Sequence, residues 1–194
     1  MPRIISEYRE EVRKKIVETA YCLTLERGYR GTTMEEIARK LGVTKPALYQ
    51  YFPGKESLYA AVAERCRQEM SGLLERSYRD RNIREGSAAL FEALAEVVPR
   101  FNEMFAEMLL LAAHNGQMRE ILRQDRIEDL RIVQQFIARQ QEEGLVSRVL
   151  DPRTLAIACD ALINGLLMDI MMGLDKDEAK EIWIAALERM IRVD

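Results

Sequence analysis

The chain has 194 residues, of which 48% are hydrophobic and 31% charged, and its formal net charge is −3. This composition is typical of a folded globular protein and excludes a disordered, fibrous or polycationic chain. The length is sufficient for one domain of ordinary size with a smaller one beside it.

Helical periodicity continues through almost the whole chain, and no alternating segment predicts a strand of useful length. The first predicted helix covers about residues 6–27 and ends at Gly28, since glycine commonly follows the last turn of a helix. Its apolar residues at helical spacing are Val12, Ile16, Ala20 and Leu23.

Two short helices are predicted within the stretch TTMEEIARKLGVTKPALYQYF. Thr33 and Glu36 have the spacing of a capping box, which begins a helix that ends at Gly42. Thr44 is placed to cap the next helix, with Pro46 in its first turn, where a missing amide hydrogen does little harm. This third helix ends before the Pro-Gly pair that follows.

The remaining sequence predicts further helices, with Asp151 and Asp175 as capping residues and Pro99 as a break or kink. Their approximate ranges are 55–78, 86–98, 100–114, 117–143, 152–174 and from 175 onward. The expected fold class is therefore all-α, with about nine helices. Three of them form a helix-turn-helix domain over residues 1–54, and the others form a helical domain over residues 55–194.

One segment, residues 155–174, is apolar enough to resemble a membrane span. Asp160 and Asp169 would each cost about 3 kcal/mol inside a bilayer. We therefore expect a fully buried helix and no membrane partner.

Charge is unevenly distributed along the chain. Residues 1–60 contain 11 Lys and Arg against 8 Asp and Glu, a net charge of +3, which leaves 18 against 24, a net charge of −6, for the other residues. A basic first part attached to an acidic body is compatible with a polyanionic partner such as nucleic acid, although an excess of three charges does not identify one.

Cysteine usage and the N-terminal residues bear on the compartment. Cys22, Cys66 and Cys159 lie far apart and form no Cys-x-x-Cys pair. This spacing argues against a disulfide framework or a zinc site and fits a reducing cytosol. The first residues, MPRIISEYREEVRKK, lack the apolar region of a secretory signal, so a cytoplasmic location is expected.

A short helix, a turn containing glycine and a second short helix form a helix-turn-helix. Ala38 is small where the two helices must approach, and Gly42 can adopt the left-handed conformation of the turn. Leu48 and Phe52 are expected to face the core, which exposes the other side of the second helix. A helix-turn-helix alone also occurs in folds that never meet DNA.

Residues 13–58 contain an ordered series of residues that is typical of one family of regulators. The series is Ile16, Ala20, Leu23, Gly28, Thr33, Ile37, Ala38, Gly42, Val43, Leu48, Tyr49, Tyr51, Phe52, Lys55 and Leu58. It resembles the DNA-binding region of the tetracycline-repressor (TetR/AcrR) family and covers about a quarter of the chain. The resemblance implies a C-terminal helical domain for ligand binding and dimerisation, although no motif of comparable specificity lies there.

By this resemblance the second short helix is the recognition helix in the major groove. Gln50 can make a bidentate contact to adenine, and the Tyr49 and Tyr51 hydroxyls would donate to phosphates. Ala47 stands where the family often has a hydroxyl residue, so it cannot make that polar contact. The alternative for each of these residues is a packed or merely solvated side chain. The implied DNA-binding residues are Thr33, Thr44, Lys45, Pro46, Ala47, Tyr49, Gln50, Tyr51 and Lys55.

Candidates for an effector site are less specific. His114, the only histidine, is either a polar group in a pocket or the end of a helix. Asp160 and Asn164 share one face of an apolar helix and would bind a ligand, or else form interface or intrachain hydrogen bonds. Methionines suggest an adaptable interior, with core filling as the default interpretation. The candidate ligand-binding residues are Met104, Met108, His114, Asp160, Asn164 and Met168.

The expected function is a ligand-responsive transcriptional regulator, a repressor released from a near-palindromic DNA operator when a small, hydrophobic molecule binds. The last two helices of each subunit are expected to form a homodimer interface. The sequence contains no Gly-rich phosphate loop, nucleophile motif or metal spacing, so no enzyme activity, cofactor or metal is expected. The alternative is a helical protein-interaction module or a small-molecule-binding protein without specific DNA binding.

Overall fold

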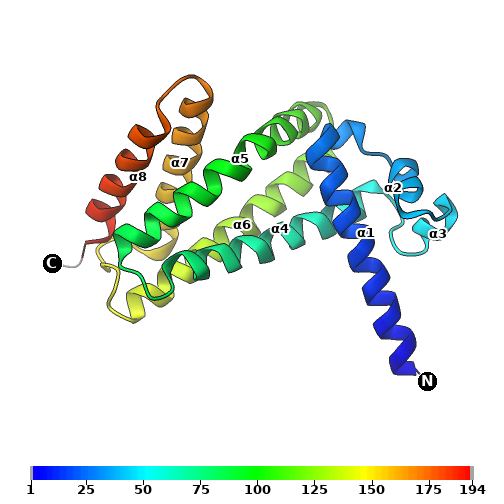
Figure 1. Ribbon diagram of the computed structural model, residues 1–194, viewed down its shortest axis with the longest axis horizontal. Helices are drawn as coiled ribbons and strands as arrows, with labels where there is room; N and C mark the ends of the chain where they lie inside the picture. The colour runs from blue at the N-terminus through cyan, green and yellow to red at the C-terminus, as the bar shows by residue number, and fades with distance from the viewer. Residues whose placement is uncertain (1, 193–194) are drawn as a thin grey trace. The chain divides into compact units, whose positions relative to one another are not determined.

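The computed structural model describes the backbone of residues 2–192 and the side chains of residues 7–96 and 106–192. All of its regular elements are helices, and residues 2–192 contain no strand, so the predicted all-α class is confirmed. The helices are α1 (Pro2–Gly31), α2 (Met34–Leu41), α3 (Lys45–Tyr49), α4 (Lys55–Tyr78), α5 (Ile83–His114), α6 (Gly116–Glu142), α7 (Pro152–Met171) and α8 (Lys176–Ile191) (Figure 1).

Two features predicted within α5 differ from the structure. Of the break or kink expected at Pro99, the break is wrong, because α5 continues through this position as one helix, and the kink stays a prediction. A proline removes one hydrogen bond from a helix interior, but a helix as long as α5 keeps those on either side. The start expected at residue 86 is also wrong, since Asn82 Oδ1 accepts a hydrogen bond from Glu85 N at 2.9 Å and caps the helix at Ile83.

Contacts divide the chain into two compact units, each crossed by the long helices α4 to α6. The first unit contains Met1–Cys66 and Phe101–Asp125, and the second contains Arg67–Arg100 and Arg126–Asp194. The first unit therefore takes in part of α5 and α6 as well as the predicted helix-turn-helix. A functional domain need not coincide with a contact unit, so the boundary between residues 54 and 55 stays a prediction.

The main core of the first unit joins α1, α2, α3 and the first turns of α4. Ile16, Ala20 and Leu23 of α1 are buried, as their spacing predicts, and so are Leu48 and Phe52. Burial of these side chains fixes α3 against α1 and α4. The complete cluster of buried residues is Ile16, Val17, Ala20, Leu23, Met34, Ile37, Ala38, Leu48, Phe52, Leu58 and Val62.

Gly28 divides α1 into two helical segments. Its backbone has φ 72° and ψ 176°, so counting the two segments separately gives nine helical segments under eight labels. Just after this kink, Glu107 of α5 accepts a hydrogen bond at Oε1 from Arg30 N at 3.1 Å. The end of α1 is thus held by a carboxylate from the first unit's part of α5.

Replacing Gly28 with alanine is expected to lower the free energy of unfolding by about 1–3 kcal/mol, because this backbone conformation is nearly restricted to glycine. The added Cβ would also lie 2.7 Å from Glu107 Oε2, which would have to move. Gly116→Ala is the matched control, since a Cβ there meets nothing within 4 Å. Urea unfolding checks the difference, and a Gly28→Ala protein as stable as Gly116→Ala would contradict it.

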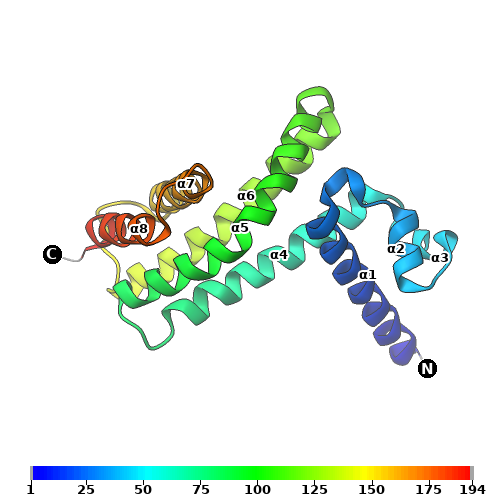
Figure 2. The ribbon, with the colours of Figure 1, turned by 45° about the horizontal axis from the view of Figure 1, so that its top comes forward.

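The core of the second unit brings α7 and α8 against α5. Trp183 and Phe91 are buried at its centre, and Trp183 Nε1 donates to Ser87 O at 3.1 Å. Around the core, Lys180 Nζ lies 2.8 Å from Glu92 Oε1. These contacts between α5 and α8 join segments about a hundred residues apart. α7 and α8 lie side by side in both ribbon views (Figure 1 and Figure 2).

The expectation that α7 is fully buried is wrong. One face packs in the core, but Met168, Met171 and Met172 at its C-terminal end are 47%, 50% and 72% exposed. Because α7 is apolar on nearly all sides, the core of the second unit covers only part of its apolar surface. α7 is long and apolar enough by length and composition to cross a membrane, but one such helix is weak evidence, because core helices pass the same test.

Candidate nucleic-acid interface

α2 begins at the predicted capping box. Thr33 Oγ1 accepts from Glu36 N at 3.2 Å, and Glu36 Oε2 accepts from Thr33 N at 3.2 Å. Glu36 Oε1 also pairs with Arg27 Nη1 at 2.6 Å. The Thr33 amide, with help from Arg27, lowers the pKa of the Glu36 carboxyl below its usual value. The reciprocal bonds and the ion pair fix the start of α2 against the end of α1.

The turn between α2 and α3 also follows the sequence prediction. Gly42 has φ 68° and ψ 28°, a left-handed conformation, and its N–H bonds back to the carbonyls of Ala38 and Arg39. Thr44 Oγ1 then accepts from Ala47 N at 3.4 Å and caps α3. The two caps and this turn set the direction of α3.

α3 and the residue that follows it present one polar face outward. Leu48 and Phe52 are each 1% exposed, whereas the Tyr49 side chain is 43% exposed. Lys45 and Gln50 are exposed as well, and Ala47 and Tyr51 are half-buried. The structure therefore brings the candidate DNA-binding residues of this segment together at one surface. The exposed ones are Thr44, Lys45, Pro46, Tyr49 and Gln50.

Lys55, expected to contact a phosphate, lies differently. Its Nζ donates to Tyr29 O and sits 3.9 Å from the centroid of the Tyr29 ring. Burial lowers the pKa of the Lys55 ammonium, an effect opposed by Glu107, Glu56 and Glu36. The phosphate contact predicted for Lys55 would require this side chain to leave Tyr29.

Arg13 is a further residue at this surface. Its Nη1 donates to Tyr51 O at 3.4 Å, and its guanidinium carbon lies 4.3 Å from the centroid of the Phe52 ring. We call α3 and the residues that follow it, 45–52 in all, the recognition segment. Arg13 thus holds the end of this segment against α1. Its position three residues before Ile16, on the same face of α1, is the sequence signal that points to this contact.

Two family models match the chain. The model described as "Bacterial regulatory proteins, tetR family" matches residues 16–62, and "BetI-type transcriptional repressor, C-terminal" matches residues 83–192. The second match alone covers more than half of the 194 residues. The chain belongs to the TetR family. Its capped α2 and α3 are the helix-turn-helix of a TetR-family regulator, so the resemblance noted in the sequence is confirmed.

One relative of the chain is a negative transcriptional regulator from a staphylococcus. Over 98 residues the chain is 28% identical to the biofilm operon icaADBC negative transcriptional regulator IcaR of Staphylococcus epidermidis, covering 50% of this chain and 53% of that protein. The chain thus spans about half the length of the curated relatives it matches.

Solved structures of similar fold cover nearly the whole chain. A regulator from Rhodococcus sp. that is assigned to the TetR family has a TM-score of 0.75 at 20% identity, over 94% of this chain and 99% of that one. A transcriptional regulator from Saccharomonospora viridis in complex with choline has a TM-score of 0.66 at 22% identity, over 94% and 98%. At such identities the likeness shows that the TetR-family fold extends through the C-terminal helices.

The candidate effector residues of this TetR-family chain are not collected in one described cavity. In the first unit, Met108 is buried in a small cluster with Tyr29, and His114 is exposed at the end of α5. For Met108 this position fits core filling, and for His114 it fits the end of a helix, which were the alternatives to ligand binding. The side chain of Met104 lies outside the described residues.

The other candidates lie on α7 in the second unit. Asp160 pairs with Arg126 of α6, and Asn164 Nδ2 donates to Asp160 O at 2.8 Å. Met168 is 47% exposed on the outer side of α7. Intrachain bonding thus accounts for Asp160, and none of the three residues lines either of two cavities found in the second unit.

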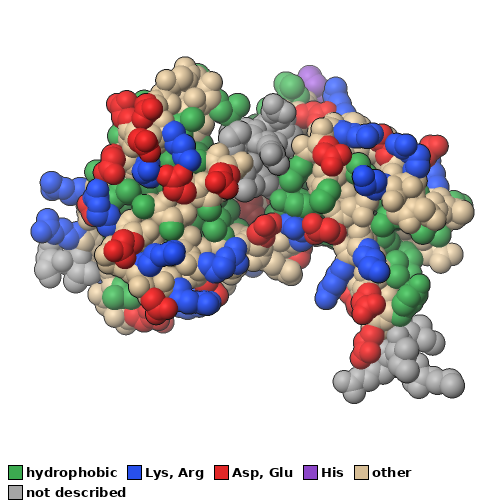
Figure 3. Space-filling model, in the orientation of Figure 1, with side chains coloured by type: hydrophobic (Ala, Val, Ile, Leu, Met, Phe, Trp, Pro, Cys, Tyr) green, Lys and Arg blue, Asp and Glu red, His purple; other side chains and the backbone are tan. Residues whose placement is uncertain are grey.

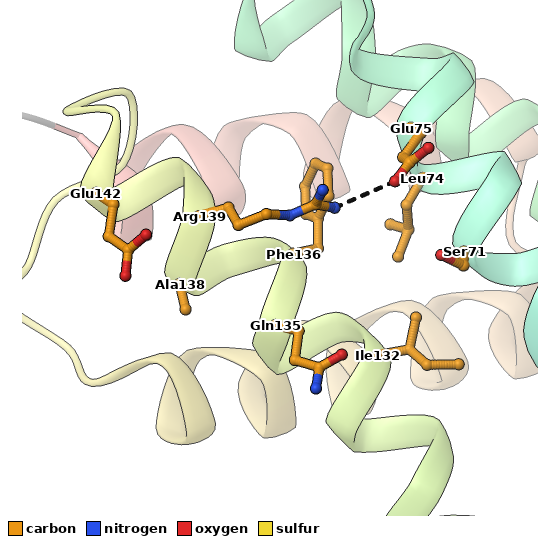
Figure 4. A pocket seen from close by; sticks show the side chains of 9 residues that line it. All are labelled: Ser71, Leu74, Glu75, Ile132, Gln135, Phe136, Ala138, Arg139 and Glu142. Atoms are coloured by element: carbon orange, nitrogen blue, oxygen red, sulfur yellow. Dashed lines mark hydrogen bonds and ion pairs between the residues drawn. The ribbon is translucent and has the colours of Figure 1, made fainter.

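One of those cavities lies between α4 and α6 within the second unit (Figure 4). Its volume is about 520 Å³, within the range of small-molecule sites. Leu74, Ile132 and Phe136 supply apolar surface, and Glu75 Oε1 lies 3.3 Å from Arg139 Nη2 across its edge. This cavity was missed from the sequence because its lining depends on how two long helices pack.

Charges of both signs are interspersed over the face drawn in Figure 3. On this face, electrostatic attraction to DNA would therefore come from particular side chains and not from a large basic area. Within the described part of the chain, no group of three or more His, Cys, Asp or Glu side chains could hold a metal ion.

Proposed function

We propose that this TetR-family regulator acts as a homodimeric repressor that binds a near-palindromic DNA operator and releases it when a small molecule binds the C-terminal body. The observation that carries the DNA-binding part is the outward face of α3. There Lys45, Tyr49 and Gln50 are exposed while Leu48 and Phe52 anchor the same helix in the core. A helix presented in this way fits the width of the major groove.

Contacts to bases and to phosphates divide along this face. Lys45 and Gln50 are suited to base edges, with Pro46 and Ala47 against thymine methyl groups. The Tyr49 hydroxyl is suited to a phosphate oxygen, which positions the helix without reading sequence. The further phosphate contacts that we propose are Thr33, Thr44, Tyr51 and Lys55.

Replacing Gln50 with alanine is expected to weaken discrimination at one base pair of each half-site by about 1–3 kcal/mol, because the bidentate contact is lost. Fluorescence anisotropy with the operator and its single-base-pair variants measures this. Gln117→Ala, at an exposed position of α6, is the matched control and should leave discrimination unchanged. Equal discrimination by wild type and Gln50→Ala at every position would refute the assignment.

The dimer interface that we propose is the outer face of α7 and α8. Met168, Met172 and Ile182 expose apolar surface there, at 47%, 72% and 41%. A two-fold axis places the same patch of each subunit against its copy, so one apolar patch is sufficient. Two recognition helices related by that axis require a near-palindromic operator.

The effector site that we propose is the cavity between α4 and α6. Its apolar side chains and the Glu75–Arg139 pair suit a small molecule with an apolar body and a polar end. Such a ligand changes the affinity for the operator only if it binds one arrangement of the dimer's two helix-turn-helix domains more tightly than another. We propose no catalytic role, and a cytoplasmic location, where the operator would be.

Selection from random duplexes tests the proposed function. Purified protein should enrich one near-palindromic sequence, with half-sites separated by a helical turn or a multiple of it. Failure to enrich any sequence, with the protein folded and dimeric, would leave a small-molecule-binding or protein-interaction protein as the better account.

A further inference from the structure

α1 extends well before the part of the chain that matches the family's DNA-binding model. The match begins at residue 16, whereas α1 begins at Pro2. The ribbon views show α1 continuing past its packing with α2 and α3 toward the N-terminus (Figure 1 and Figure 2). Residues 2–15 of α1 therefore lie outside the matched segment, and we call them the extension.

One arginine of this extension lies against the recognition segment. The Arg9 guanidinium carbon is 5.7 Å from the centroid of the Tyr51 ring, and Arg9 is exposed. Arg13, one turn later on the same face, is half-buried over Phe52 and bonds to Tyr51 O. Arg13 therefore completes the fold, whereas Arg9 carries its charge at the surface beside α3.

The contact with Tyr51 orients Arg9 without burying it. A cation over an aromatic ring at an exposed site is attracted only weakly, and 5.7 Å is near the outer limit of such contacts. That is sufficient to bias the side chain toward α3 and leaves the guanidinium N–H groups accessible. Planar guanidinium groups are well suited to phosphate oxygens.

The acidic residues of the extension point elsewhere. At 3.6 residues per turn, Glu7 and Glu11 lie on the opposite side of α1 from Arg9, and Glu10 about a quarter turn away. Carboxylates that would repel a phosphate are therefore not on the face that carries Arg9. Arg9 and Arg13 therefore share the face of α1 toward Tyr51 and Phe52, whereas Lys14 and Lys15 lie on other faces of the helix.

We propose that Arg9 binds a phosphate of the DNA backbone flanking the base pairs read by α3, with the Tyr51 ring positioning its guanidinium. The inference rests on the proposed DNA-binding function and adds a contact outside the matched helix-turn-helix. Because a phosphate contact carries no sequence information, Arg9 contributes affinity and salt dependence, and not base preference.

The test uses the full chain and its selected operator duplex, with the dissociation constant measured from 50 to 200 mM KCl. Arg9→Gln is expected to make the slope of log K against log salt shallower by about 0.9 for each phosphate contact, or roughly 1.8 per dimer. Operator and unrelated duplexes should lose affinity by the same factor. Lys15→Gln removes an exposed charge from another face of α1 and should leave the slope near that of wild type.

Two comparisons separate the possible outcomes. Arg9→Lys keeps the charge and is expected to keep the wild-type slope, and a slope as shallow as that of Arg9→Gln would show a packing role and overturn the proposal. An Arg9→Gln slope equal to wild type, while Gln50→Ala still loses discrimination, would overturn it and leave the proposed function standing. Absence of specific binding by wild type would instead overturn the proposed function.

Discussion

Replacing Phe52 with alanine is expected to lower the stability of the first unit by about 3–5 kcal/mol and to abolish operator binding. Phe52 is 1% exposed, packs in the cluster that holds α3, and lies beneath the Arg13 guanidinium. A loss of this size is a large part of the stability of an ordinary domain. Without the ring, α3 has no fixed direction from which to read a groove.

Denaturant titration followed by two probes checks this prediction. Circular dichroism reports helix in both units, whereas the fluorescence of Trp183, the only tryptophan, reports the second unit. Phe52→Ala should lose part of the helical signal at lower denaturant. The control Tyr49→Ala removes an aromatic ring that is 43% exposed, so its stability should stay within about 0.5 kcal/mol of wild type. Unfolding of Phe52→Ala at the wild-type midpoint would contradict the packing of α3.

The substitution Met168→Glu is expected to raise the dimer dissociation constant by about 100-fold or more. Met168 lies on the outer face of α7, and a two-fold axis would place two new carboxylates in one apolar interface. Burying an unpaired charge costs several kcal/mol, and each 1.4 kcal/mol is roughly a factor of ten. A dissociated regulator would engage only one half-site and would lose most of its affinity for the operator.

Sedimentation velocity across a concentration series measures the effect of Met168→Glu. Val149→Glu is the control, because Val149 is 82% exposed in the segment between α6 and α7, outside the two helices proposed to form the interface. It should leave the dimer intact. If Met168→Glu sediments as a dimer at the same concentrations as Val149→Glu, the subunits meet through another surface.

Features set by neighbouring residues could be predicted from the sequence. Thr33, Thr44, Asp151 and Asp175 each cap a helix through bonds to amides two or three residues ahead, so their roles follow from local spacing. The left-handed turn at Gly42 follows for the same reason. These local signals were sufficient to predict where α2 and α3 lie in the sequence. Together with the apolar spacing, they also predicted that Leu48 and Phe52 face the core.

Features that depend on distant residues could not be predicted. Lys55 begins α4 where expected, but its ammonium is directed by the Tyr29 carbonyl, which lies 26 residues earlier. The partner of Asp160, Arg126, is 34 residues away. Apolarity of α7 is evident in the sequence, yet which of its faces is left uncovered depends on how α8 packs.

The most direct test of the account is the ratio of affinities for the selected operator and for a scrambled duplex of equal length and composition, at physiological salt. A recognition helix that reads bases predicts a ratio of about 10³ or more. Gln50→Ala should reduce that ratio mainly by weakening operator binding, whereas Arg9→Gln should lower both affinities and keep the ratio. A wild-type ratio near one would mean that α3 does not read sequence, and would contradict the function proposed for this chain.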